Sequence, residues 1–391
     1  MHRRSFLTVL AGFAAIGSHT AKAASLVQDT QPFSKTALIE EARTLARNPY
    51  VAPDMVPQEW RDLTYDQYKS IWFKNDEALW KNTNSPYRVD LFLPGLYFKR
   101  SVQIYSVEDG MAKHFKFDFG LFDKTDKVPG LPVEGGLGYS GFRLRSEIEE
   151  PGIFQEFMVM QGASYFRAIA KGQHYGLSAR GLALNTADPK GEEFPDFTKF
   201  WIERPAEGAI KIVIHALLNG PSAAGIYSFV ITPGVSTVMD ISAQIFARKE
   251  LDHIGLGPLT SMFLFDESNR TRFDDFRPAV HDSDGLLVHN GAGETLWRAL
   301  ANPKNLQVSS FVDYGPKGFG LMQRPRNFSN FADLEAAYHK RPGLWVEPGE
   351  NWGKGSVTLV EIPADREIYD NIVAYWRPRV PIPAGGEHKF T

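Results

Sequence analysis

From residue 87 onward, short runs in which apolar and polar residues alternate are separated by Gly, Pro and Asp. The clearest runs are 88–93, 102–106, 114–119, 210–214, 226–231 and 356–362. Alternation with a period of two, in runs rich in β-branched and aromatic residues, is typical of antiparallel strands with one buried face. Long helices do not recur between the runs, which argues against a parallel α/β sheet. The pattern predicts a mainly all-β fold, one large antiparallel β-sandwich with a few short helices.

Three segments have helical rather than strand patterns. Ser34 is suited to cap a helix over 35–47, because the apolar residues of that segment fall on one side. Thr64 and Gln67 have the spacing of a capping box ahead of a second helix. A third helix is predicted over 329–339, where an Arg-Pro-Gly sequence follows. The first two helices precede the strands, so we expect them to pack against the sheet.

The first 23 residues have the pattern of an export signal. Arg3 and Arg4 precede a short apolar run, and Ala21-Lys22-Ala23 is a small-x-small cleavage site. The paired arginines resemble a twin-arginine signal, while ordinary secretory export stays open. The apolar run is too short to span a bilayer, and no later segment is long enough. We expect cleavage after Ala23 and an exported mature protein without a membrane span.

The far end of the chain changes composition after Trp376. Residues 377–386 are rich in Pro and Gly, as in a linker, and the last five residues have a strand pattern. We therefore predict three parts: a signal peptide at 1–23, a β-sandwich domain at 24–376, and a linker with the start of a truncated C-terminal domain at 377–391.

Composition excludes several classes of function. A formal net charge of −3 over 391 residues argues against nucleic-acid binding, which needs a basic face. Cysteine is absent, which excludes thiol chemistry and disulfides. The sequence has no nucleophile elbow, no complete P-loop and no histidine pair with zinc spacing, so we predict neither a cofactor nor a metal. The 13% of aromatic residues suits a large β core and also sugar binding, and the core is favoured.

The densest group of charged residues lies between 272 and 286. Its members are Arg272, Asp274, Asp275, Arg277, His281, Asp282 and Asp284. Three interpretations stay open. The carboxylates can cap turns and pair with the arginines; residues 282–285 can form part of a calcium loop, although the terminal Glu is missing; or one acid can serve glycoside hydrolysis, which needs two carboxyl groups.

Asp370 is a lone acid just before the apolar run 372–376. An acid at the entrance of a strand can bind backbone N–H groups. Alternatively, apolar surroundings raise its pKa, as a proton donor requires. The sequence leaves both interpretations open.

Two further stretches, 165–181 and 343–353, mix aromatic rings with charged residues. The first contains Tyr175 and Arg180, and the second contains Trp345, Glu347 and Trp352. They are either half-buried strands with a solvated face or the walls of a sugar groove.

Eight ordered stretches resemble the periplasmic glucan biosynthesis proteins of the G and D type. They are LFLPGLY at 91–97, GYSGFR at 138–143, YFRA at 165–168, YGLSARGL at 175–182, FWIERP at 200–205, FDDFRP at 273–278, VHDSDGL at 280–286 and DNIVAYW at 370–376. The likeness runs from about residue 32 to the end, and the export signal looks more like the D type.

This resemblance implies a large β-sandwich of the galactose-mutarotase type, followed by an immunoglobulin-like domain that is missing here. It also implies an activity similar to that of endo-acting β-1,2-glucanases, inverting in some cases, or of related transglycosylases that cyclise the glucan. By motif, Asp370 matches the proposed general acid and Asp282 the proposed base on the water side. The family is thought to relay protons through substrate hydroxyls or water chains.

The resemblance further implies a periplasmic protein that binds β-1,2-glucan, with the inner-membrane glucan synthase as a partner and a homodimer as an open option. The substrate-binding residues that we predict are Asp284, Arg277, His281, Tyr175, Arg180, Trp345, Glu347 and Trp352. An alternative is a non-catalytic protein that binds the nascent glucan and controls its backbone structure. A weaker third alternative is a mutarotase-type epimerase, which would need a His–Glu pair.

Overall fold

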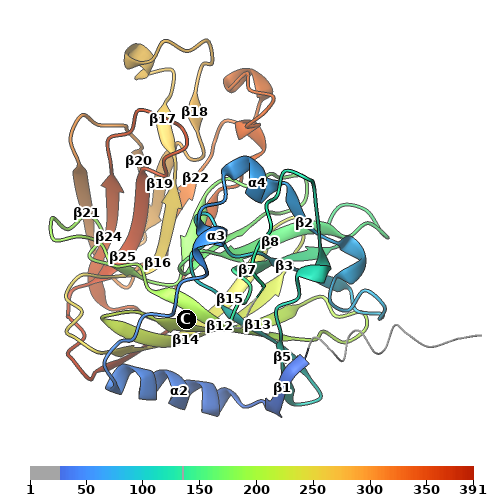
Figure 1. Ribbon diagram of the computed structural model, residues 1–391. Coiled ribbons are helices and arrows are strands. Elements are labelled where there is room, and N and C mark those ends of the chain that lie inside the picture. The colour runs from blue at the N-terminus through green and yellow to red at the C-terminus, as the bar shows by residue number, and fades with distance from the viewer. Residues whose placement is uncertain (1–26, 134–135) are drawn as a thin grey trace, which may run out of the picture.

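The computed structural model describes residues 27–133 and 136–391 (Figure 1). The predicted signal peptide at 1–23 lies outside the described residues. Two large sheets dominate the structure, which confirms the predicted all-β class. None of the helices in the described part of the chain is long and apolar enough to cross a membrane.

The first sheet has eight strands. Their order is β1 (Val27–Pro32), β5 (Met111–Phe115), β4 (Gln103–Glu108), β12 (Asp196–Glu203), β13 (Ile212–Asn219), β14 (Ala223–Thr232), β15 (Val238–Ala247) and β26 (Glu387–Phe390). Neighbouring strands are antiparallel except β4 and β12, which run parallel. The predicted run 114–119 is a strand only as far as Phe115.

The second sheet has ten strands, and all its neighbours are antiparallel. Its order is β21 (Gln307–Tyr314), β24 (Lys354–Glu361), β25 (Ile372–Pro378), β16 (Ile254–Ser261), β10 (Ser178–Arg180), β9 (Tyr165–Ala168), β8 (Gln155–Gln161), β7 (Gly141–Ser146) and β3 (Tyr87–Phe92), with β11 (Ala183–Leu184) also on β16.

The apolar faces of the two sheets meet in one core. The rings of Phe142 and Phe200 pack edge to face with centres 5.1 Å apart, and those of Phe166 and Phe229 do so at 5.2 Å. Each pair joins a strand of one sheet to a strand of the other. Buried rings of this size carry much of the hydrophobic stabilisation, so the sandwich is held mainly from its centre.

Small sheets extend beyond this sandwich. They are β17 (Phe263–Phe265) with β18 (Val280–His281), β2 (Ile71–Phe73) with β6 (Phe122–Lys124), and β20 (Thr295–Ala299), β19 (Gly285–His289), β22 (Gly318–Met322) and β23 (Leu344–Val346) in that order. Figure 1 shows β17 and β18 standing above the end of β16. The segments between these strands carry most of the acids discussed below.

Helix α2 (Lys35–Arg47) confirms the first predicted helix. The Ser34 hydroxyl accepts a hydrogen bond from the backbone of the first turn, as an N-cap does. Leu38 and Ala42 are buried against the outer face of the eight-stranded sheet, which α2 covers (Figure 1).

The remaining helical elements are short. They are α3 (Gln58–Arg61), α4 (Tyr65–Lys69), and the 3-10 turns η1 (Asn75–Glu77), η2 (Phe119–Leu121), η3 (Arg270–Arg272), η4 (Phe328–Asn330) and η5 (Tyr338–Lys340). The predicted capping box of Thr64 and Gln67 is present at the start of α4. That helix ends at Lys69, because the next residues leave it to form β2.

The helix predicted over 329–339 is wrong. This segment forms only the turns η4 and η5, and Ala332 and Ala337 between them have φ angles of +52° and +47°. A positive φ interrupts a right-handed helix. The Asp333 carboxylate accepts hydrogen bonds from the N–H groups of Glu335 and Ala336, at 2.9 and 2.7 Å, and so stabilises a turn instead.

The last residues complete the eight-stranded sheet. Strand β26 pairs with β15, and the ring of Phe390 packs edge to face on Tyr227 at 6.2 Å. The carbonyl of Thr391 accepts hydrogen bonds from Gly349 N–H at 2.9 Å and Trp352 Nε1 at 3.2 Å. Residues 387–390, which we predicted to begin a further domain, therefore belong to the sandwich. The other predicted boundaries stay predictions.

Candidate functional site

The outer face of the ten-stranded sheet is polar. On neighbouring strands, Asp90 pairs with Arg143. Arg143 pairs in turn with Val159, and Val159 pairs with Arg167. Directly paired residues point to the same face of an antiparallel sheet. Tyr165 and Arg180 pair on this face in the same way. We call this surface the polar face.

Ion pairs fix the floor of the polar face. The fully buried Asp90 carboxylate binds Arg143 at 2.7 Å and Arg145 at 2.9 Å. Arg143 also binds Glu156 at 2.9 Å. Buried charges are tolerated when they are paired in this way, so these side chains form a rigid base rather than free ligands.

Asp370 lies at one side of the polar face, in the loop that leads into β25. Its Oδ2 is 3.4 Å from Nη2 of Arg167, and its side chain is 35% exposed. The next residue, Asn371, is buried, and its amide accepts from the N–H of Phe263 at 2.8 Å and donates to the carbonyls of Phe263 and Ile362, each at 3.0 Å. This anchor fixes where Asp370 stands.

Burial raises the pKa of the Asp370 carboxyl, while the positive charges of Arg167, Arg341 and Arg180 oppose that shift. The side chain is reachable from solvent yet surrounded by protein atoms. A carboxyl in such a place keeps its proton to higher pH than a free aspartate does, as a proton donor requires.

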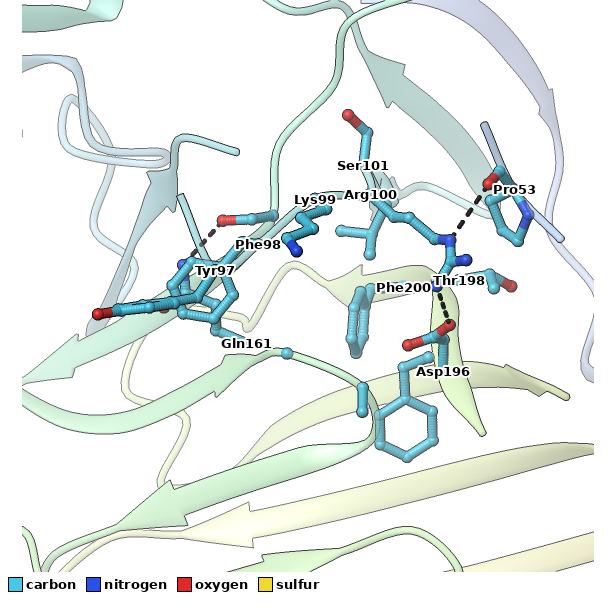
Figure 2. A pocket seen from close by; sticks show the side chains of 15 residues that line it. Pro53, Tyr97, Phe98, Lys99, Arg100, Ser101, Gln161, Asp196, Thr198 and Phe200 are labelled. Carbon is cyan, nitrogen blue, oxygen red and sulfur yellow. Dashed lines mark hydrogen bonds and ion pairs between the residues drawn. The ribbon is translucent and has the colours of Figure 1, made fainter. Parts of the chain in front are cut away.

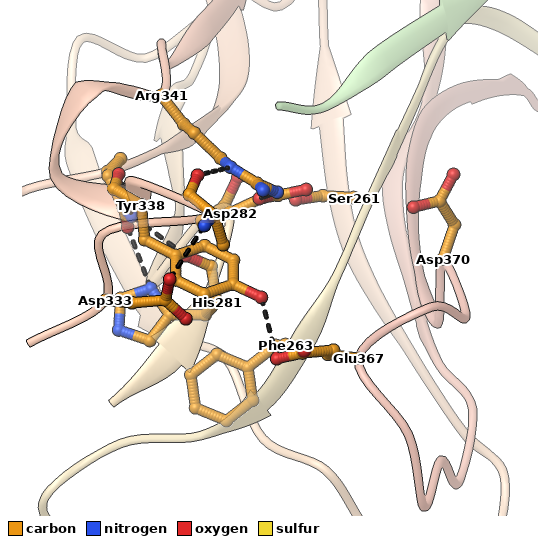
Figure 3. A network of polar contacts seen from close by, with 12 residues as sticks. Ser261, Phe263, His281, Asp282, Asp333, Tyr338, Arg341, Glu367 and Asp370 are labelled. Carbon is orange, nitrogen blue, oxygen red and sulfur yellow. Dashed lines mark hydrogen bonds and ion pairs between the residues drawn. The ribbon is translucent and has the colours of Figure 1, made fainter. Parts of the chain in front are cut away.

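Asp282 follows β18 and lies deeper than Asp370. Its side chain is only 5% exposed, and Oδ1 accepts a charged hydrogen bond from Nη1 of Arg341. Burial raises the pKa of the Asp282 carboxyl to about 6; Arg341 opposes the shift, and the negative charge of Asp370 adds to it. The two acids therefore interact electrostatically, and Figure 3 shows them on separate segments facing the same region.

A chain of polar contacts connects Asp282 with the loop that carries Asp370 (Figure 3). The guanidinium of Arg341 lies over the ring of Tyr338, 4.3 Å from its centre. The Tyr338 hydroxyl donates to Oε2 of Glu367 at 2.9 Å. Glu367 precedes Asp370 by one turn of the loop, so both acids are tied to one network.

Arg277 is the centre of this network. Its guanidinium binds the carboxylates of Asp275 at 2.7 Å, Asp333 at 2.6 Å and Glu367 at 2.8 Å. These carboxylates raise the pKa of Arg277, although burial opposes them. Loops 274–277 and 328–335 border an open groove of about 620 Å³. The predicted contact of Arg277 with a sugar stays a prediction, and its observed contacts tie three loops together.

Tyr175 is brought to the acids from a distant stretch. Gly176 packs directly on the side chain of Arg341, and a Cβ at this position would lie 2.9 Å from Cβ of that arginine. The Tyr175 hydroxyl is buried beside Glu156, and burial raises its pKa. Its phenol lies within electrostatic range of Glu156, Arg143 and Arg167 of the polar face.

Arg180 is also on the polar face, where it is buried. Its guanidinium binds Glu192 at 2.6 Å and lies over the rings of Tyr165 and Phe194, 5.5 and 5.4 Å from their centres. Its charge lowers the pKa of Asp370. Arg180 therefore acts on the acid through space, while its predicted contact with substrate stays a prediction.

His281 and Asp284 lie next to Asp282 in sequence but have partners of their own. The buried His281 ring stacks on Phe263 at 5.4 Å and shares a 2.8 Å hydrogen bond with Gln323, and burial lowers its pKa. Asp284 binds Arg324 through Nε at 2.6 Å and the backbone N–H at 2.9 Å. Their predicted contacts with substrate stay predictions.

The three predicted residues of the stretch 343–353 stand elsewhere. Trp345 packs edge on against His289 at 4.9 Å, and Trp352 packs against Phe390 at 6.0 Å. Glu347 is exposed. No contact within the described residues connects these three with Asp282 or Asp370, so the structure does not bring them to the acid pair.

The site also contains residues that sequence reasoning missed. Arg341, which binds Asp282 from 59 positions away, was interpreted as the end of a helix. Tyr338 and Asn371 carried no signal of their own. Arg167 lay within a stretch already noted as polar and aromatic, and the period of two in that stretch was the one available sign of its orientation.

The calcium and epimerase interpretations have little support in this geometry. Asp282 and Asp284 each pair with an arginine, and the described residues include no group of three or more His, Asp or Glu that could hold a metal ion. A His–Glu pair exists at His215 and Glu203, 2.7 Å apart, but on the eight-stranded sheet under Phe33. His215 is fully buried there, as a structural histidine is.

The raised pKa of Asp282 predicts a pH effect on stability. The pKa of this carboxyl is about 6 in the folded state against an ordinary value of 3.8. The group therefore stabilises the fold below pH 3.8 and loses this contribution as pH rises through about 6. The free energy of unfolding of Asp282→Asn, relative to that of wild type, should therefore rise by up to roughly 3 kcal/mol between about pH 4 and pH 7. A shift in favour of wild type would mean that Arg341 outweighs burial.

Comparisons with known proteins define the class. Residues 33–391 match the family described as "Periplasmic glucan biosynthesis protein, MdoG". The chain belongs to this family, which confirms the predicted resemblance and a periplasmic location. Among its relatives is Glucans biosynthesis protein G of Vibrio cholerae, 51% identical over 364 residues that cover 93% of this chain and 67% of that protein.

Glucans biosynthesis protein G 1 of Shewanella oneidensis is 50% identical over 362 residues, which cover 92% of this chain and 66% of that protein. The chain thus spans about two thirds of the length of these relatives. Both carry the G name, whereas the export signal pointed to the D type.

Proposed function

We propose that this protein cleaves or remodels β-1,2-linked glucan in the periplasm by acid–base catalysis, with Asp370 as general acid and Asp282 as base. The observation that supports this proposal is that two acids far apart in the sequence lie close enough to interact electrostatically. Each carboxylate is held by its own arginine, and burial raises the pKa of both. Glycosidic cleavage needs such a pair of carboxyl groups.

The different depths of the two acids suit different roles. Asp370 is one third exposed and can reach a glycosidic oxygen directly. Asp282 is almost fully buried, so it accepts its proton through a water or a sugar hydroxyl. In hydrolysis, the oxygen of water bonds to the anomeric carbon as the bond to the leaving oxygen breaks. The proton of Asp370 goes to the leaving oxygen, and that of water passes to Asp282.

This assignment predicts a bell-shaped dependence of kcat/KM on pH. Asp282 must be ionised to act as base, so activity should fall as pH drops through about 6. Asp370 must keep its proton to act as acid, and burial, which raises its pKa, favours the protonated form. The Asp282→Asn variant should lose the acidic limb from the pH profile of whatever activity remains. An acidic limb that persists in this variant would assign it to another group.

A second function deserves a test, because both acids are ion-paired as purely structural acids are. In that case the protein binds the nascent glucan and controls its backbone structure without cleaving it. The polar face would serve equally well as a binding surface.

Incubation with linear β-1,2-glucan separates the two functions. Chromatography would follow chain length, and NMR of the new anomeric centre would distinguish inversion from retention. Shorter or cyclic products from the wild-type chain support the enzyme. Glucan that is bound but unchanged contradicts it and supports the binding protein.

A further inference from the structure

A cavity of about 180 Å³ lies beside the start of β12 (Figure 2). Most of its lining comes from three segments: residues 97–102, the turn between β8 and β9, and the first residues of β12. Its lining includes Tyr97, Lys99, Arg100, Gln161, Asp196 and Phe200. We call it the Tyr97 cavity. Neither Asp282 nor Asp370 lines it.

Tyr97 is held at the tip of a tight turn. Gly95 and Phe98 exchange two backbone hydrogen bonds of 2.8 Å, and the N–H of Leu96 donates to the carbonyl of Trp60 at 2.9 Å. Leu96 has a φ of +49°, which is costly for a residue other than glycine. Tyr97 as a whole is nonetheless 72% exposed. The fold thus fixes the backbone that carries this largely exposed tyrosine.

The opposite wall is equally constrained. Gly162 has a φ of +79° and packs on the ring of Phe98, and Ala163 has a φ of +43°. The amide of Gln161 donates to the Ser140 hydroxyl at 2.8 Å. Left-handed residues other than glycine concentrate where a fold positions a ligand, and two of them flank this cavity.

The polar groups of the cavity have unused hydrogen-bonding capacity. Within the described residues, the Asp196 carboxylate has one ion pair, with Arg100 at 3.8 Å, which is longer than a hydrogen bond. Its side chain is only 26% exposed, and burial raises its pKa. Arg100 also donates to the carbonyl of Pro53 at 3.2 Å. A half-buried carboxylate of this kind gains from hydroxyl donors.

The lining selects a class of ligand. An exposed ring and the apolar side chains of Phe197 and Phe200 match the C–H face of a sugar, while Asp196 and Gln161 match its hydroxyls. The polar rim opposes a hydrocarbon. The volume suits one sugar ring rather than a chain.

Strand β9 connects the cavity with the acid pair. Its four residues begin just after the Gln161–Ala163 turn and include Arg167, the partner of Asp370. At the rise of a strand they span roughly 13 Å, a distance that a few linked sugars can bridge. We infer that the Tyr97 cavity binds one glucose residue of a glucan chain whose other residues lie at Asp370 and Asp282. This inference rests on the glucan ligand of the proposed function.

Calorimetric titration with long linear β-1,2-glucan tests the inference. An Asp370→Asn background prevents cleavage during the measurement. Adding Tyr97→Ala should weaken binding roughly tenfold, because the second contact of a linked ligand is lost. Asp196→Asn, which keeps the shape of the cavity, should also weaken it. Tyr65→Ala is the matched control, since Tyr65 is 62% exposed and does not line the cavity.

Melting temperatures close to that of the background chain would show that the two cavity variants fold. If both then bind the long glucan as the background chain does, the inference is overturned. The binding result does not depend on catalysis. If the cavity variants bind more weakly while wild type fails to cleave, the cavity stays assigned and the proposed cleavage is refuted. Where wild type cleaves, Tyr97→Ala should also change the lengths of the products.

Discussion

The Asp370→Asn variant is expected to cleave linear β-1,2-glucan roughly 100- to 10,000-fold more slowly than wild type, the range that a general acid contributes. The amide matches the carboxyl in size and still accepts a hydrogen bond from Arg167, so binding should change little. Appearance of new chain ends over time gives kcat, and calorimetry gives the affinity. Asp365→Asn is the matched control, because it replaces an exposed carboxylate in the same loop.

A substrate with a good leaving group distinguishes the acid from the base. An aryl β-1,2-gluco-oligosaccharide needs no proton on its leaving oxygen, so Asp370→Asn should recover most of its activity there. Asp282→Asn should stay inactive, because the water must still be deprotonated. The reverse pattern would exchange the two roles. Equal losses on both substrates would indicate that the acids only maintain structure.

The strands were predictable because their pattern is local. In the run 226–231, alternating side chains face the core and the opposite surface, and the structure confirms a strand there as β14. The helix over 329–339 failed for a non-local reason. Its apolar spacing suits a helix, yet Asp333 binds Arg277, a residue 56 positions away, and the chain turns to permit this contact.

The candidate site was predictable only in part. The resemblance supplied Asp282 and Asp370, and the sequence showed neither Arg341 nor the pairing that places Arg167 beside Asp370. Such contacts depend on the register of strands and on loops that meet in three dimensions. Trp345, which the sequence places in a Gly-rich loop, belongs to strand β23 and contacts His289; its predicted contact with a sugar stays a prediction.

Arg277→Ala is expected to destabilise the protein by roughly 3 kcal/mol, because it leaves buried carboxylates without a counter-charge. Asp333 and Asp275 are 10% and 20% exposed, whereas Glu367 at 38% is partly relieved by water. Denaturant unfolding measures the loss. Arg366→Ala, at an exposed arginine in the loop that carries Glu367, should stay near wild type.

The same substitution should lower kcat more than it raises KM, since the network of Arg277 positions the Asp370 loop and, through Glu367 and Tyr338, Arg341. Arg277→Lys keeps the charge but cannot bind three carboxylates with a planar fork, so it should restore stability more than turnover. If lysine restores both equally, charge alone matters and the positioning role fails. If kcat is unchanged while stability falls, the network holds the fold without placing the acid.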